Sequence, residues 1–462
     1  MKTHVKLMTE GKPVRLIVTF AFPLMIGNIF QQMYSVADSM IVGKTLGVAA
    51  LAALGASTWP NWIFLGVVMG LSQGVSITLA HSFGRGDEGR LRRGFGNSIV
   101  LCAVFAFFLL LGGEFLAPDM LRFLGTPEEL IPQALVYLRI SYAGIPVIAA
   151  YNLLASTLRA LGDSRTPLYS MITASVINIA LDLLFVCIFR WGIGGAAWAT
   201  IIAQFFSAVF CLPAILRIRQ LHISSNDLTP DFPLLKSVAI LSAPMMLQNF
   251  FIVVGGMVVQ SVVNTFSVTF IAGFTAGAKM HGVLEIATSS FGFAMTTYVA
   301  QNLGAGRLDR IHEGVRSAFW AAIATACVIA AVMLLTGRTI LSGFVSGTPE
   351  EVKATVDVAY RYLAIMCVCL PVLYLLYIFR SSTQGLGNTF LPMVSAFAEL
   401  IMRVASALVL ARVIGEDGLF IAEVAAWGGA VAVLVFSYFH TIRKIERDRR
   451  DRRDRGRFSV SK

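Results

Sequence analysis

Charged residues are scarce in this sequence. Asp, Glu, Lys and Arg make up 14% of the 462 residues, whereas a soluble globular protein carries about 25%. Hydrophobic residues make up 56%. This balance excludes an ordinary soluble enzyme, a disordered chain and a nucleic-acid-binding domain, and it predicts a polytopic membrane protein. Because a spanning helix needs about 20 apolar residues, the chain has room for a dozen spans and short loops.

The chain also lacks the patterns of a disulfide framework, a zinc site or an enzyme. The six cysteines lie inside apolar runs and form no Cys-x-x-Cys pair. The six histidines are scattered, without a His-Glu-x-x-His motif. No nucleotide-binding loop is present. We therefore expect no enzymatic activity and no cofactor, so that an ion gradient must drive any transport.

Twelve apolar runs predict an all-α fold with twelve transmembrane helices. They cover residues 15–41, 50–80, 94–117, 132–158, 167–189, 193–216, 234–262, 269–300, 314–336, 354–379, 390–411 and 419–441. A polar linker divides the chain almost in half. The predicted organisation is an N-terminus (1–14), an N-lobe (15–217), a linker (218–233), a C-lobe (234–442) and a basic tail (443–462).

Lys and Arg are concentrated in the termini and the even-numbered loops. These segments hold 27 of the 37 basic residues, with Arg380 counted in the tenth loop, whereas the odd-numbered loops hold six. By the positive-inside rule, both termini are expected in the cytoplasm and the protein in the cell membrane. The tail holds ten basic and four acidic residues, so we expect it to lie in solvent near anionic lipid.

The two halves resemble each other at a shift of about 220–225 residues. Gly125-Thr126-Pro127-Glu128-Glu129 recurs identically at 347–351, and the flanks of Pro23 and Pro244 are similar. Each half has six spans, an even number, so both halves enter the membrane from the same face. This predicts two six-helix lobes related by a pseudo-twofold axis along the membrane normal, an architecture of alternating-access transporters.

Several short motifs stand out along the chain, namely Pro23, Tyr34-Ser35-Val36-Ala37-Asp38, Val42-Gly43, Leu161-Gly162-Asp163, Asn178-Ile179-Ala180-Leu181-Asp182, Gln384-Gly385-Leu386-Gly387 and Glu399-Leu400-Ile401-Met402-Arg403. Together they resemble the multidrug and toxic compound extrusion (MATE) transporters. The resemblance covers about 14–442. It implies a cation-coupled antiporter that exports drug-like, often cationic organic compounds. The larger superfamily includes lipid and polysaccharide flippases, which remain the alternative. We expect small organic molecules and membrane lipids as partners, no nucleic acid, and a monomer.

Charged side chains inside a span are costly and therefore informative. Asp38 is 23 residues past Arg15, or about 35 Å along a helix, which places it in the outer half of the first span. Asp182 and Asn178, one helical turn apart on the fifth span, and Thr200 on the sixth reach a similar depth. Two carboxylates in a dry cavity must take up a proton or a cation. The resemblance implies that these four residues form a cation site, for H+ or Na+.

The second half has no matching carboxylates, since positions 38 and 182 correspond to Val259 and Ala407. Its own charges have other interpretations. Glu399 and Arg403, four residues apart on one helix, predict a structural ion pair. Glu285, near the middle of the eighth span, is expected to meet either a cationic substrate or a partner in its own lobe. Substrate is expected to bind in a cleft between the two lobes. The candidate substrate-binding residues are Asn28, Gln32, Tyr34, Asn249 and Glu285.

Overall fold

A computed structural model describes residues 4–343 and 348–460, with side chains as far as Asp451. Over these ranges the chain forms helices and turns and no strand, which confirms the all-α fold class. The first three residues, Gly347 of the repeated motif and the last two residues of the tail lie outside the described residues.

Each half is a bundle of long helices. The first half comprises α1 (Pro13–Leu46), α2 (Val48–Arg85), α3 (Glu88–Phe123), α4 (Ile131–Ala143), α5 (Ile145–Ala160), α6 (Arg165–Asp182), the π-helical turn η1 (Leu183–Ile188) and α7 (Gly192–Leu216). The linker holds two 3-10 turns, η2 (Arg219–Leu221) and η3 (Ser225–Leu228). The second half comprises α8 (Phe232–Val263), α9 (Val268–Gly304), α10 (Leu308–Ser342), α11 (Pro349–Gly385), α12 (Phe390–Val413) and α13 (Glu416–Val460).

Each of the twelve predicted spans coincides with one helical segment, counting α4 with α5 and α6 with η1. Ten segments are long and apolar enough to cross a bilayer, and the pair α4–α5 makes an eleventh. The twelfth, α9, has 37 residues but is more polar, because Lys279, His281 and Glu285 interrupt it. The predicted span at 132–158 is a bent pair of helices, α4 and α5. It bends by 47° between Ala143 and Ile145, because Pro146 cannot continue the hydrogen bonds of α4.

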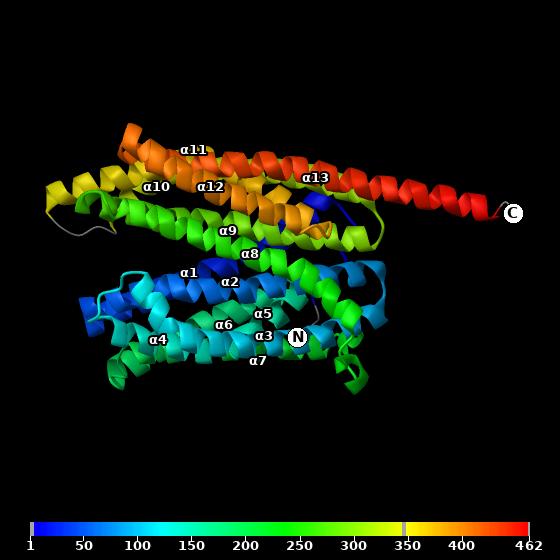
Figure 1. The fold of residues 1–462 in the computed structure, drawn as a ribbon, viewed down its shortest axis with the longest axis horizontal. Helices are drawn as coiled ribbons and strands as arrows, with labels where there is room; N and C mark the ends of the chain where they lie inside the picture. The colour runs from blue at the N-terminus through cyan, green and yellow to red at the C-terminus, as the bar shows by residue number, and fades with distance from the viewer. Residues whose placement is uncertain (1–3, 344–347, 461–462) are drawn as a thin grey trace.

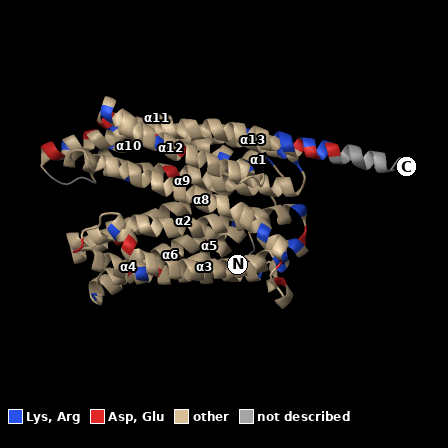
Figure 2. Ribbon diagram, viewed as in Figure 1, with Lys and Arg blue, Asp and Glu red and all other residues tan. Residues whose placement is uncertain are grey.

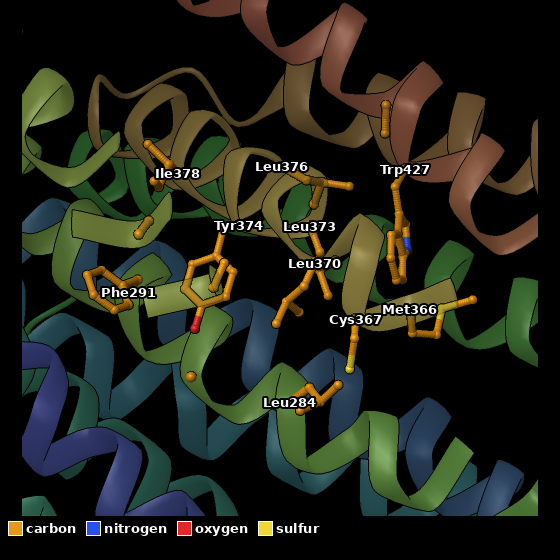
Figure 3. Packing of buried hydrophobic residues seen from close by; sticks show 14 of the residues in the cluster. Leu284, Phe291, Met366, Cys367, Leu370, Leu373, Tyr374, Leu376, Ile378 and Trp427 are labelled. Atoms are coloured by element: carbon orange, nitrogen blue, oxygen red, sulfur yellow. The ribbon is translucent and has the colours of Figure 1, made fainter. Parts of the chain in front are cut away.

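The two halves lie as two layers of roughly parallel helices, and both termini lie toward the same end of the bundle (Figure 1). Lys and Arg gather at that end (Figure 2). The second half has one large core, in which Leu284 and Phe291 of α9 meet Met366 and Tyr374 of α11 and Trp427 of α13 (Figure 3). The first half has separate, smaller cores.

The start of α1 packs in the core of the second half. Leu16, Ile17 and Phe20 are buried in the same cluster as residues of α9, α10 and α11. Further along, α1 packs in the first half against α6, at Gly27 and Met171, and against η1, where Thr45 Oγ1 lies 3.4 Å from Cys187 Sγ. Helix α1 therefore packs against both halves of the molecule, although it is part of the first half of the chain.

Small residues bring α2 against α8 at the centre of the molecule. A Cβ atom on Gly70 would lie 2.6 Å from the backbone nitrogen of Met246, and the Ser242 hydroxyl donates to the carbonyl of Leu71 at 3.2 Å. Residues Gly70 to Gly74 match the Gly-x-Ser-x-Gly pattern of serine hydrolases, so the prediction that the chain lacks every enzyme pattern is wrong at this position. Here the pattern lies in the middle of a helix, without the strand-to-helix turn that exposes a nucleophile. Its glycines serve close helix packing instead.

Residues 4–12, here called the N-terminal strap, join the two halves at the end that carries the termini. The Lys6 N–H donates to the carbonyl of Leu161 at 3.1 Å in the first half. The Met8 N–H donates to Gln301 Oε1 at 2.7 Å in the second half. Gln301 also donates from Nε2 to the carbonyl of Ala160 at 2.8 Å. One glutamine thus binds the strap and the opposite half together.

The linker is attached to α3 of the first half. Asn97 donates to the carbonyls of Asp227 and Thr229 at 3.2 and 3.3 Å. The buried Asp227 carboxylate accepts hydrogen bonds from the N–H and the hydroxyl of Ser224 and pairs with Arg92 at 2.8 Å. These hydrogen bonds, the Ser224 N–H first, hold the pKa of Asp227 below its ordinary value of 3.8.

We expect Asp227→Asn to lower the thermal stability of the purified protein in a pH-dependent manner. A carboxyl whose pKa is lowered by folding adds stability above its ordinary pKa and loses it as the pH falls through the lowered value. The difference in melting temperature between wild type and variant should therefore be largest near neutral pH. It should shrink as the pH falls below 3.8. A difference that stays constant from about pH 7 to about pH 2.5 would contradict this assignment.

Candidate functional site

Asp38 and Asp182 lie together inside the first half. Asp182 ends α6, immediately before the π-helical turn η1, and is fully buried; Asp38 on α1 is 8% exposed. Helix α1 packs along α6 and η1, and the two carboxyl groups are close enough for their charges to interact. Short π-helical turns are frequent at functional sites, since they redirect the side chains around them.

Asn178 and Thr200 extend this cluster. Asn178 is fully buried one turn before Asp182 on α6, and its Nδ2 donates to Thr200 Oγ1 of α7 at 3.4 Å. The structure therefore brings together, from three helices, the four residues to which the sequence assigned a similar depth. We call Asp38, Asn178, Asp182 and Thr200 the N-lobe cluster.

The N-lobe cluster is rich in acceptor oxygens that lack donors. Asp38 Oδ1, Asn178 Oδ1 and both carboxylate oxygens of Asp182 are buried without a hydrogen-bond partner among the described residues. Buried polar atoms normally have such partners. The other buried carboxylates of the described chain do: Asp163 accepts from Thr166, Asp227 from Ser224 and Glu399 from Arg403. The missing positive or donor group fits a proton or a cation held by these oxygens.

Two tyrosines lie beside the N-lobe cluster. Tyr34 of α1, a candidate substrate-binding residue, is close enough to Asp38 and Asp182 for electrostatic interaction. Tyr137 of α4 is close to the same two carboxyl groups. Tyr137 could not be singled out from the sequence, because its neighbours come from other helices. Hydroxyl groups here can supply hydrogen bonds or oxygen ligands.

Two of the other substrate candidates, Asn28 and Asn249, lie between the two halves. Asn28 of α1 donates to Ser290 Oγ of α9 at 3.4 Å. Asn249 of α8 donates to the carbonyl of Gly66 in α2 at 2.9 Å. Gln32 is half-buried on α1. Two of the three amides thus hold the halves together in this conformation, and they must exchange partners if the halves separate.

The second half contains a buried charge network. Glu399 of α12 lies between Arg403 at 2.8 Å and Arg380 at 2.7 Å, and Arg403 also contacts Glu423 at 3.0 Å. The prediction for Arg380 was wrong. It is not a loop residue, since it lies inside α11 and is 5% exposed. Glu399 and Arg403 do pair, within a network of two arginines and two glutamates.

Glu285 has a partner in its own half. Its Oε1 accepts a hydrogen bond from the Tyr377 hydroxyl of α11 at 2.6 Å. Tyr377 in turn lies near Arg380, whose guanidinium carbon is 6.0 Å from the ring centre. Glu285 therefore lies at the edge of the charge network, held by a neutral donor and not by an arginine.

These features define a class of protein: a polytopic transporter built from two helical lobes, with a buried polar cluster in one of them. The chain belongs to the MATE family. The family model MatE matches residues 23–184 and 244–409, and these two stretches begin at Pro23 and Pro244, which the internal repeat equates. The protein is therefore a transporter of small molecules and not an enzyme.

Named relatives and solved structures are similar over most of the chain. The probable multidrug resistance protein YpnP of Bacillus subtilis is 32% identical over 306 residues, which cover 66% of this chain and 68% of the relative. The probable multidrug resistance protein YoeA of the same organism is 27% identical over 442 residues, 92% of this chain and 93% of the relative. A crystal structure of MATE in complex with MaL6 has a TM-score of 0.88 at 21% identity and covers 96% of this chain and 99% of that chain. That likeness shows the fold.

We expect Glu399→Gln to destabilise the protein strongly. The change removes the charge that faces Arg380 and Arg403, and breaking a buried ion pair costs about 3–5 kcal/mol. The measurement is unfolding of the purified variant in detergent. Asp357→Asn is the matched control, because its ion pair with Arg338 at 2.7 Å is exposed and should matter little. Equal stability of the two variants would show that the buried network is not structural.

Proposed function

We propose that this protein is a cation-coupled antiporter that exports drug-like, often cationic organic compounds by alternating access. The observation that supports it is the N-lobe cluster, in which buried carboxylate and amide oxygens lack donors. Ionised carboxylates in such surroundings are unfavourable. A proton or Na+ from the outside relieves this cost, so its entry supplies the free energy for a rearrangement.

Helix α1 is the proposed route from ion to substrate. Asp38 lies on its later part, beside the N-lobe cluster, and its start is packed in the core of the second half. Loading of the cation allows α1 to repack along α6, with Pro23 as the place where the helix bends most easily. Repacking of α1 displaces substrate from between the N-lobe (15–217) and the C-lobe (234–442). Binding of ion and substrate is then mutually weakening, and the effect is reciprocal.

The contacts at the end with the termini act as the closed gate in this proposal. The N-terminal strap and Gln301 join the halves there, and His81 of α2 bonds to the carbonyl of Gly385 at 2.8 Å. We place this end in the cytoplasm, because Lys and Arg gather there (Figure 2). Both termini are then cytoplasmic in a monomer of the cell membrane, and the basic tail faces anionic lipid.

A lipid or polysaccharide flippase of the same superfamily is the alternative function. Such a protein needs cationic groups for the phosphates of its substrate. The buried arginines Arg380 and Arg403 are instead paired with Glu399 and Glu423, and the N-lobe cluster is acidic. Both observations favour organic cations over phosphate-bearing lipids.

The test is efflux from proteoliposomes with a pH gradient or a Na+ gradient imposed separately. We expect Asp38→Asn to abolish gradient-driven efflux of a cationic dye, because the side chain at position 38 can then no longer bind or release a proton. The protein should still fold, since Asp38 Oδ1 has no donor to lose.

Asp357→Asn again serves as the control, because it makes the same chemical change at an exposed carboxylate. It should transport like wild type. Undiminished efflux by Asp38→Asn at matched protein amount would contradict the proposed coupling, and transport of phosphate-bearing lipid in place of the dye would favour the flippase.

A further inference from the structure

Gln204 extends the N-lobe cluster by one more oxygen. It lies on α7 one helical turn after Thr200, so both side chains project from the same face of the helix. Its Oε1 is buried and, like the oxygens of Asp38 and Asp182, has no hydrogen-bond partner among the described residues. The sequence alone does not distinguish Gln204, because a single glutamine in an apolar span ordinarily forms hydrogen bonds between helices.

Gln204 also lies close to α1. Its side chain is near the Tyr34 hydroxyl, and Gln31 is near the same hydroxyl. Because Oε1 of Gln204 has no partner, the Nε2 end of the amide is the end that can donate to the tyrosine oxygen. One end of the amide can therefore interact with α1, and the other end is an unpartnered acceptor.

The unpartnered acceptors then number five. They are Asp38 Oδ1, Asn178 Oδ1, Asp182 Oδ1, Asp182 Oδ2 and Gln204 Oε1, from three helices of one lobe. A proton bound to a carboxyl group forms one hydrogen bond and cannot satisfy an amide oxygen on another helix as well. A hard cation takes several oxygens at once, from carboxylates and amides alike. An acceptor set of this kind favours a metal cation over a proton.

We propose that Gln204 is a ligand that gives this site its preference for Na+ over H+ and that reports Na+ binding to α1 through Tyr34. When Na+ is bound, Oε1 of Gln204 turns toward the ion, and the movement of the amide changes how it meets Tyr34. The proposal rests on the proposed cation coupling and adds the identity of the ion and a residue that selects it.

The experiment measures the Na+ dependence of dye binding and dye efflux with the purified full-length protein. We expect Na+ to weaken dye binding to wild type. In Gln204→Leu, the Na+ concentration for half of this effect should rise about tenfold or more, while efflux driven by a pH gradient is retained. Gln260→Leu is the matched control, because Gln260 is on α8 in the other half and bonds only to exposed Asn264 at 2.9 Å; it should respond to Na+ like wild type.

A second variant distinguishes the role of Gln204 as an ion ligand from the role of Tyr34 in transmitting the effect to α1. Tyr34→Phe removes the hydroxyl but leaves Oε1 of Gln204 in place, so Na+ should still bind with nearly unchanged affinity, measured as protection against thermal unfolding, while its effect on dye binding is reduced.

Three outcomes would overturn the proposal. In the first, wild type responds to a pH gradient and not to Na+, so that the proposed antiport stands and the Na+ preference fails. In the second, Gln204→Leu loses the H+ and Na+ responses equally, which would show that Gln204 has a structural role. In the third, it keeps the wild-type response to Na+. Failure of wild type to respond to either gradient would instead contradict the proposed function itself.

Discussion

Burial of carboxylate oxygens without donors is the constraint that sets the energetics of the first half. Elsewhere in the described chain, buried charge is matched: Glu399 lies between two arginines, and Asp227 is held by Ser224 and Arg92. Asp182 is as deeply buried and has neither kind of partner. Because an unmatched charge in an apolar interior costs several kcal/mol, the energy of this region depends on whether a cation is present. The balanced network of the C-lobe has no such dependence.

Helix α1 connects this region to the rest of the molecule. The same helix carries Asp38 and Tyr34 beside the N-lobe cluster and buries Leu16 and Phe20 in the core of the C-lobe. A change in its packing near the ion must therefore be felt across the interface between the lobes, which is held at the other end by the strap and Gln301. Coupling between ion and substrate requires a shared structural element of this kind. Binding of the ion and binding of the substrate must favour different positions of that element.

Much of the fold could be predicted from the sequence, because a bilayer demands long apolar runs and makes charge within them rare. The same rarity singled out Asp38 and Asp182. The rest depends on contacts between helices. The sequence treated Arg380 as the first residue of a loop, since it cannot show that Glu399 of another helix would bury it. Likewise, Tyr137 and Gln204 are ordinary residues of apolar spans until the fold places Tyr137 near the two carboxylates and Gln204 near Tyr34.

The most direct test of the central claim is the affinity of purified protein for a cationic dye, measured from about pH 5 to about pH 9 with and without Na+. If the N-lobe cluster couples ion to substrate, added Na+ or lowered pH weakens dye binding to wild type, and Asp182→Asn removes most of that response. An affinity that is insensitive to both ions, in wild type and in Asp182→Asn alike, would mean that these buried carboxyl groups are structural and would contradict the account.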